Sequence, residues 1–121
     1  NVVIGTGGSA VKDGYYKIIG KTVFFRARFV LGTSGASVSG SVTLTLPVTA
    51  ATYSTTSYIG LVRISDADPA KIYIGQMTSG GLVGVGNASG TNVYSDALSS
   101  SVPITWAAGD SLAVQGFYEI A

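Results

Sequence analysis

The stretch that decides the fold covers residues 15–31 and reads YYKIIGKTVFFRARFVL. Gly20-Lys21 separates two apolar runs, and a glycine at the first of two central positions is what a type II′ turn requires. We therefore predict a β-hairpin with a two-residue loop. The pairing that follows from this turn is Ile19 with Thr22, Ile18 with Val23, Lys17 with Phe24, Tyr16 with Phe25 and Tyr15 with Arg26.

Side chains alternate between the two faces of a strand, so this register divides the hairpin into two faces. The face that we expect to point into the core is apolar apart from one phenol and holds Tyr16, Ile18, Val23, Phe25, Ala27, Phe29 and Leu31. The other face mixes apolar groups with three cations and holds Tyr15, Lys17, Ile19, Thr22, Phe24, Arg26, Arg28 and Val30.

The second face is too apolar for solvent and too charged for a core, so we expect it to contact a subunit or a ligand. A subunit interface, or ordinary cross-strand pairing, is the favoured interpretation. The interface candidates are Tyr15, Lys17, Ile19, Phe24, Arg26 and Arg28. Two cation–π pairs are expected there, Arg26 with Tyr15 and Lys17 with Phe24.

Composition indicates one folded domain that assembles with other copies. The chain has 121 residues, of which 46% are hydrophobic and only 11% are charged. Such a balance excludes a disordered chain and favours burial of surface in an oligomer. The net charge of +1 argues against nucleic-acid binding through a basic surface, and no apolar run is long enough to span a membrane.

Strand and turn signals fill the rest of the chain, and no window has the apolar period of a helix. We predict a strand over residues 39–46, a turn at Asp13-Gly14 and a loop over residues 86–92. Residues 1–10 are expected to be a linker or an edge strand, and residues 11–121 a single head domain. The predicted fold class is all-β, a jelly-roll-like antiparallel β-sandwich.

Residues for catalysis or metal binding are scarce. The chain lacks His and Cys, which removes Ser-His-Asp triads, thiolate chemistry and ordinary zinc sites. Asp66 and Asp68 could offer oxygens to Ca²⁺, but a turn in which Asp bonds its own backbone is favoured. Asp13 and Asp110 also stand in predicted turns. We therefore expect no enzyme activity, no catalytic residue, no metal and no cofactor.

Aromatic and amide side chains in predicted loops are the candidates for a saccharide site. Tyrosine rings stack on sugars, and neighbouring amides and hydroxyls bond to sugar hydroxyls. The candidate ligand-binding residues are Tyr53, Tyr58, Tyr73, Asn87, Asn92 and Tyr94. The alternative for each tyrosine is that its ring caps the core and its hydroxyl meets water.

Three segments resemble one known family of domains. Residues 14–29 resemble a G-x-Y-x-x-x-G-(K/R)-x-V-x-F hairpin found in C-terminal domains of tailed-bacteriophage tail fibres and minor tail proteins. Residues 41–50 resemble the LP-x-x-A element that follows it there. Residues 104–119, which include ITWAAGDSL and GFYE, are similar to the closing W-x-x-G-D strand of that family.

The resemblance implies a homotrimeric jelly-roll head at the tip of a virion fibre, outside the cell when it acts. It implies a binding role, with a bacterial surface glycan or another surface receptor as the partner. Two alternatives remain open at this point. One is a structural virion module, for capsid decoration or fibre trimerisation, without a ligand. The other is a cellular lectin or adhesin domain.

Overall fold

A computed structural model describes residues 2–51, 58–68, 70–81, 83–89 and 92–121, and within these ranges the chain is all-β, without a helix. The strands are β1 (Val2–Val3), β2 (Val11–Ile19), β3 (Thr22–Val30), β4 (Ser37–Val38), β5 (Tyr58–Ala67), β6 (Ala70–Thr78), β7 (Val83–Ser89), β8 (Asn92–Ala97) and β9 (Ser111–Glu119).

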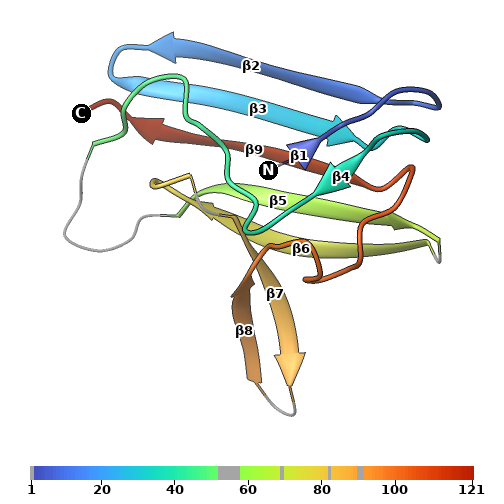
Figure 1. The fold of residues 1–121 in the computed structure, drawn as a ribbon. Helices are drawn as coiled ribbons and strands as arrows, with labels where there is room; N and C mark the ends of the chain where they lie inside the picture. The colour runs from blue at the N-terminus through green and yellow to red at the C-terminus, as the bar shows by residue number, and fades with distance from the viewer. Residues whose placement is uncertain (1, 52–57, 69, 82, 90–91) are drawn as a thin grey trace.

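One large antiparallel sheet forms the body of the molecule, in the order β2-β3-β9-β5-β6-β7-β8. The second layer is thinner. It consists of the small sheet β1-β4 and of irregular segments that cross in front of the large sheet (Figure 1). The predicted fold class, an all-β antiparallel β-sandwich in one domain, is confirmed, with two layers of unequal content.

The hairpin that the sequence predicts is present with the predicted register. Ile19 pairs with Thr22, and the ladder continues without a bulge to Val11 opposite Val30. Gly20 has a φ of 61°, the positive value that the first central position of a type II′ turn requires. β3 then pairs with β9 and β9 with β5, so this turn sets the facing of side chains across the centre of the sheet.

Two expectations for β2 are wrong. Tyr16 and Ile18 lie on the core-facing side of the hairpin, but they are 57% and 45% exposed because the second layer does not cover this outermost strand. Asp13-Gly14 is no turn: both residues continue β2, where Gly14 pairs with Ala27 and the Asp13 carboxylate pairs with Arg28.

Residues 39–46 do not form the strand that their alternating pattern predicts. The alternation itself is present, because Val42 is buried and Leu44 is partly buried, both against the core. Their backbone N–H groups donate to Leu98 and Gly81, which lie in two different segments, so no continuous ladder forms. The predicted loop over residues 86–92 is also wrong, because β7 and β8 form a hairpin that extends through most of it.

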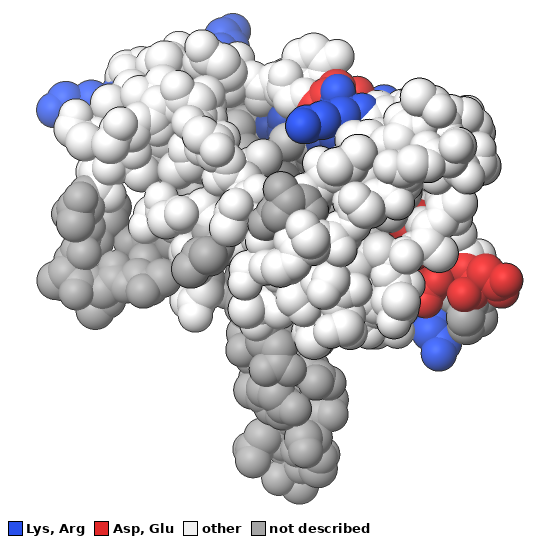
Figure 2. Space-filling model, viewed as in Figure 1, with Lys and Arg blue, Asp and Glu red and all other residues white. Residues whose placement is uncertain are grey.

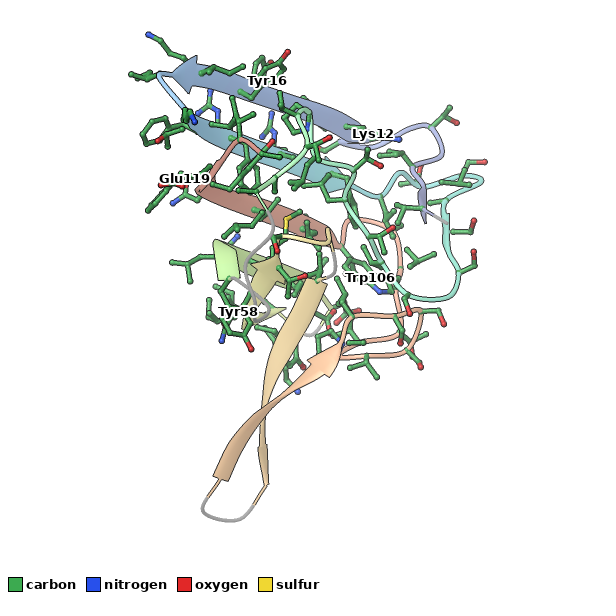
Figure 3. The ribbon with its side chains drawn as sticks, turned by 90° about the vertical axis from the view of Figure 1, so that its left-hand side faces the viewer. Lys12, Tyr16, Tyr58, Trp106 and Glu119 are labelled. Atoms are coloured by element: carbon green, nitrogen blue, oxygen red, sulfur yellow. The ribbon has the colours of Figure 1, made fainter. Side chains whose placement is uncertain are left out.

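The core lies between the large sheet and its cover. Its buried side chains are Val23, Phe25, Phe29, Leu31, Val42, Ile59, Val62, Ile64, Met77, Val83, Leu98, Ile104, Leu112, Val114 and Tyr118. Trp106 packs on Phe29 at a ring-centroid distance of 5.5 Å and donates its indole N–H to the Ser99 carbonyl. Figure 3 shows Trp106 among the covering segments and Glu119 toward the opposite side of the sheet.

A pair of glycines lets the Phe25 ring reach across the centre of the sheet. Phe25 pairs with Gly116 on β9, and Gly116 pairs with Gly60 on β5. The Phe25 ring comes within 3.3 Å of the place where a Cβ of Gly60 would stand, and it packs edge-on against Tyr118. A Cβ at Gly116 would overlap the Ile59 carbonyl oxygen.

We therefore predict that Gly116→Ala destabilises the domain by about 1–3 kcal/mol or more, because a well-packed centre must shift to admit one methyl group. The measurement is the free energy of unfolding from urea titration. Gly80→Ala is the control, since a Cβ there meets only the Thr78 hydroxyl, at 3.8 Å. Equal stability of the two variants would contradict this account of the glycine pair.

Candidate functional site

The face of the large sheet that points away from the core has no cover among the described residues, and we call it the open face. Seven of its large apolar side chains are 45–64% exposed. They come from five neighbouring strands: Tyr15 and Ile19 on β2, Phe24 on β3, Phe117 on β9, Leu61 on β5, and Ile72 and Ile74 on β6. Exposed apolar side chains gathered on one face are typical of interaction surfaces.

Cross-strand pairing arranges these side chains in rows. Phe24 and Phe117 are partners, with ring centroids 5.9 Å apart and planes at 40°. The next row crosses five strands and reads Tyr15, Arg26, Gln115, Leu61 and Gln76. An aromatic row therefore lies beside a polar row that can donate and accept hydrogen bonds.

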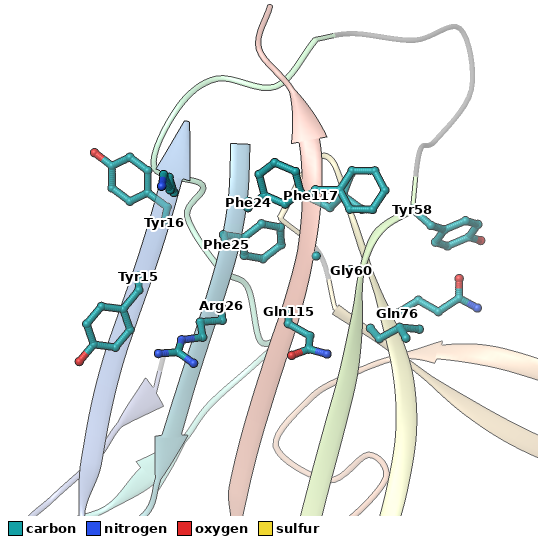
Figure 4. Close-up of a pocket in the computed structure, with 14 residues that line it drawn as sticks. Tyr15, Tyr16, Phe24, Phe25, Arg26, Tyr58, Gly60, Gln76, Gln115 and Phe117 are labelled. Atoms are coloured by element: carbon teal, nitrogen blue, oxygen red, sulfur yellow. The ribbon is translucent and has the colours of Figure 1, made fainter. Parts of the chain in front are cut away.

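Two shallow grooves lie on the open face. The first, of about 760 Å³, runs over the glycine pair between the Phe117 ring, Tyr58 and the amide of Gln76 (Figure 4). The second, of about 610 Å³, lies over Arg63 and Ile74 and shares four residues with the first. The shared residues are Tyr15, Arg26, Leu61 and Gln115.

The charged groups of the open face are mainly cations. Arg28 donates from Nε to both carboxylate oxygens of Asp13, at 3.0 and 3.2 Å. The Arg26 guanidinium lies 5.2 Å from the centre of the Tyr15 ring, which confirms the predicted cation–π pair. Lys17 stands opposite Phe24 as predicted, but the described residues show a cation–π contact only for Arg26.

The register places the six interface candidates on the open face together: Tyr15, Lys17, Ile19, Phe24, Arg26 and Arg28. Sequence reasoning missed their continuation on β9, β5 and β6, above all Leu61, Ile74 and Phe117. The sequence pattern that predicts this continuation is present, because each of these three apolar residues stands next to a residue that faces the core. Phe117, for example, stands between Gly116 and Tyr118 of a strand whose other face is apolar.

The ligand candidates do not form one cluster. Tyr58 lines the first groove of the open face. Tyr73 is partly buried against the core, on the other side of the sheet. Tyr58 belongs to β5 and Tyr73 to β6, which are ten and nine residues long.

Three ligand candidates lie on the β7–β8 hairpin. Asn87 pairs with Tyr94, and Asn92 lies two residues before Tyr94 on β8. The expectation that Asn87 and Asn92 lie in a loop is corrected, because both are in strands. The hairpin projects from the body of the domain (Figure 1). Tyr53 lies outside the described residues.

Carboxylates in the described turns bond to the backbone. Asp66 accepts the Asp68 amide at 3.1 Å, which is the turn that the sequence favoured over a calcium loop. Asp110 is buried and accepts the amides of Ala67 and Ala107 at 2.8 and 2.7 Å. No cluster of three or more metal-ligating side chains occurs in the described part of the chain.

In comparisons with known proteins, no family model, no curated protein and no solved structure matches the chain. The described residues also contain no helix that is long and apolar enough to cross a membrane.

If Asp110 serves the fold rather than chemistry, its replacement must cost stability. We predict that Asp110→Ala lowers the free energy of unfolding by about 1–3 kcal/mol, because two backbone donors lose their acceptor. Asp68→Ala is the matched control, since that side chain is exposed at the tip of the β5–β6 hairpin, and its expected effect is within about 0.5 kcal/mol. Chemical denaturation of both variants makes the comparison, and a silent Asp110→Ala would contradict the structural role.

Proposed function

We propose that this chain is the head domain of a bacteriophage tail fibre or minor tail protein, and that it attaches the virion to the bacterial surface by binding a saccharide. The open face carries the proposal. A binding head needs a surface for assembly with other copies and a separate surface for the receptor, and this domain has a candidate for each.

The open face supports assembly into a homo-oligomer, and the family resemblance makes a trimer the expected form. Seven large apolar side chains on one sheet face, each about half exposed, are poorly suited to water. Only 11% of the residues are charged, which is unfavourable for the solubility of an apolar monomer. The covered side of the molecule also shows few charged side chains (Figure 2).

The β7–β8 hairpin supports receptor binding. The hairpin projects away from the open face, which assembly would cover. In its register Asn87 pairs with Tyr94, and Asn92 is two residues from Tyr94. Several weak saccharide sites on one oligomer gain avidity when they engage the same cell surface. The use of Asp66 and Asp110 in backbone contacts supports binding rather than hydrolysis.

Assembly through the open face predicts that Leu61→Lys disperses the oligomer. Leu61 lies at the centre of the face, in register with Gln115 and near the cations Arg26 and Arg63, so an added ammonium group would be desolvated among like charges. We expect association at least about tenfold weaker by light scattering. Val3→Glu replaces an exposed apolar residue on β1 and is expected to keep the native mass.

Receptor binding predicts that the labelled domain binds isolated bacterial wall glycan and that periodate treatment of the glycan removes this binding. Tyr94→Ala should reduce binding at least tenfold, since an aromatic stacking partner is lost, while the oligomer mass stays unchanged. Tyr58→Ala, on the open face, should leave glycan binding intact.

An oligomer that binds no glycan from any tested wall would favour the structural virion module over the receptor-binding head. Release of reducing ends from the glycan would instead show an enzyme and contradict the proposal.

A further inference from the structure

Strand β2 is an unpaired sheet edge of full length. It is the first strand of the large sheet, and among the described residues it pairs on one side only, with β3. It contains no proline, and its ladder to β3 has no bulge, so it lacks two of the devices that keep edges from associating. Both of its faces are also uncovered, since Tyr15 and Ile19 are exposed on one side and Tyr16 and Ile18 on the other.

The backbone hydrogen bonds at the two ends of β3 establish which backbone groups of β2 point away from the sheet. The carbonyl of Lys21 accepts the amide of Ile120, and Leu31 exchanges hydrogen bonds with Gly109 and Asp110, so odd-numbered residues of this strand direct their backbone groups toward β9. Even-numbered residues of β3 therefore bond to β2, and their partners there are odd-numbered. The groups that point to the open edge are those of Lys12, Gly14, Tyr16 and Ile18.

This alternation limits how two copies of β2 can pair. In an antiparallel pair the free residues must oppose one another, so even-numbered residues must meet even-numbered ones. A two-fold axis at Asp13 would place two carboxylates opposite each other, and an axis at Lys17 two ammonium groups, which is unfavourable. An axis at Tyr15 instead places Asp13 of each copy opposite Lys17 of the other.

The axis at Tyr15 also uses the whole strand, because Tyr15 is the central residue of β2 (Val11–Ile19). On the open face, Val11 then lies opposite the partner's Ile19. On the core-facing side, Gly14 lies opposite the partner's Tyr16, whose exposed ring can cover the glycine. In this single register Asp13, Val11 and Gly14 find suitable partners, and Lys12 lies opposite the partner's Ile18.

We propose that β2 pairs with β2 of a second copy of this chain, antiparallel and centred on Tyr15, so that two sheets join into one continuous sheet. The contact is isologous, since the same strand serves both copies. It is independent of the proposed attachment function and differs from the open-face contact. An isologous contact implies an even number of copies: two by itself, or six where a three-fold contact is also present.

Disulfide trapping tests the register directly, because the chain has no cysteine of its own. In the proposed pair Tyr15 faces its own counterpart at a non-hydrogen-bonded position, where Cα atoms are about 4.5 Å apart and a disulfide can form. Tyr15→Cys should therefore give a covalent dimer under mild oxidation. Ile19→Cys is the control. In the same register the two copies of Ile19 lie at opposite ends of the strand pair, eight residues or about 26 Å apart along the strand.

Charge exchange gives a second, independent readout. Lys17→Asp and Asp13→Lys should each weaken self-association of β2 at least tenfold, because like charges then face each other twice. An equimolar mixture of the two variants should restore association as a heterodimer. Circular dichroism verifies that Asp13→Lys, which also loses the exposed ion pair to Arg28, remains folded.

Both experiments are carried out in the Leu61→Lys background as well, so that failure of the open-face contact is distinguishable from failure of the edge contact. Faster cross-linking of Tyr15→Cys than of Ile19→Cys, in either background, together with rescue in the charge-exchange mixture, supports the proposal. Equal cross-linking of the two cysteine variants, no rescue in the mixture, or an odd number of copies by light scattering overturns it.

Discussion

The two-residue turn at Gly20-Lys21 is the constraint on which the arrangement of side chains depends. It pairs Ile19 with Thr22, and from there the facing of every residue in β2 and β3 follows. β9 inherits this facing through its ladder to β3, and β5 inherits it through β9. A slip of one residue at the turn would exchange Phe25 for Phe24 in the core, so the buried side chains strongly favour a single register.

The unequal cover of the sheet explains why one face stays open. Individual contacts hold the covering segments in place: the Tyr118 hydroxyl donates to the Val48 carbonyl and accepts its amide, and Asp110 ties the turn before β9 to the end of β5. All of these contacts lie on one side of the sheet. The other side has no cover among the described residues, and its exposed apolar groups stand beside charged ones, as Phe24 does beside Arg26 on β3 and Leu61 beside Arg63 on β5.

Sequence alone predicted what depends on local chemistry: the hairpin, its register, the Arg26–Tyr15 contact and the turn at Asp66. It failed where long-range contacts decide. Residues 39–46 have a strand pattern, but their backbone finds partners in two separate segments. The sequence also did not predict the extent of the open face or the exposure of Tyr16. Alternation shows which residues share a face of the sheet, but it does not show whether another layer covers that face.

The distribution of charge separates the two contacts of the domain. Lys17, Arg26, Arg28 and Arg63 all stand on the open face, and Asp13 and Glu119 offset part of their charge. Two such faces stacked directly about a two-fold axis would bring cations together in a desolvated contact, which is costly. A rotational arrangement, in which each face meets a different surface of its neighbour, avoids this repulsion. Edge pairing about Tyr15 needs no such arrangement, because each Lys17 meets a carboxylate. The same residues therefore disfavour self-stacking of the face and favour self-pairing of the edge.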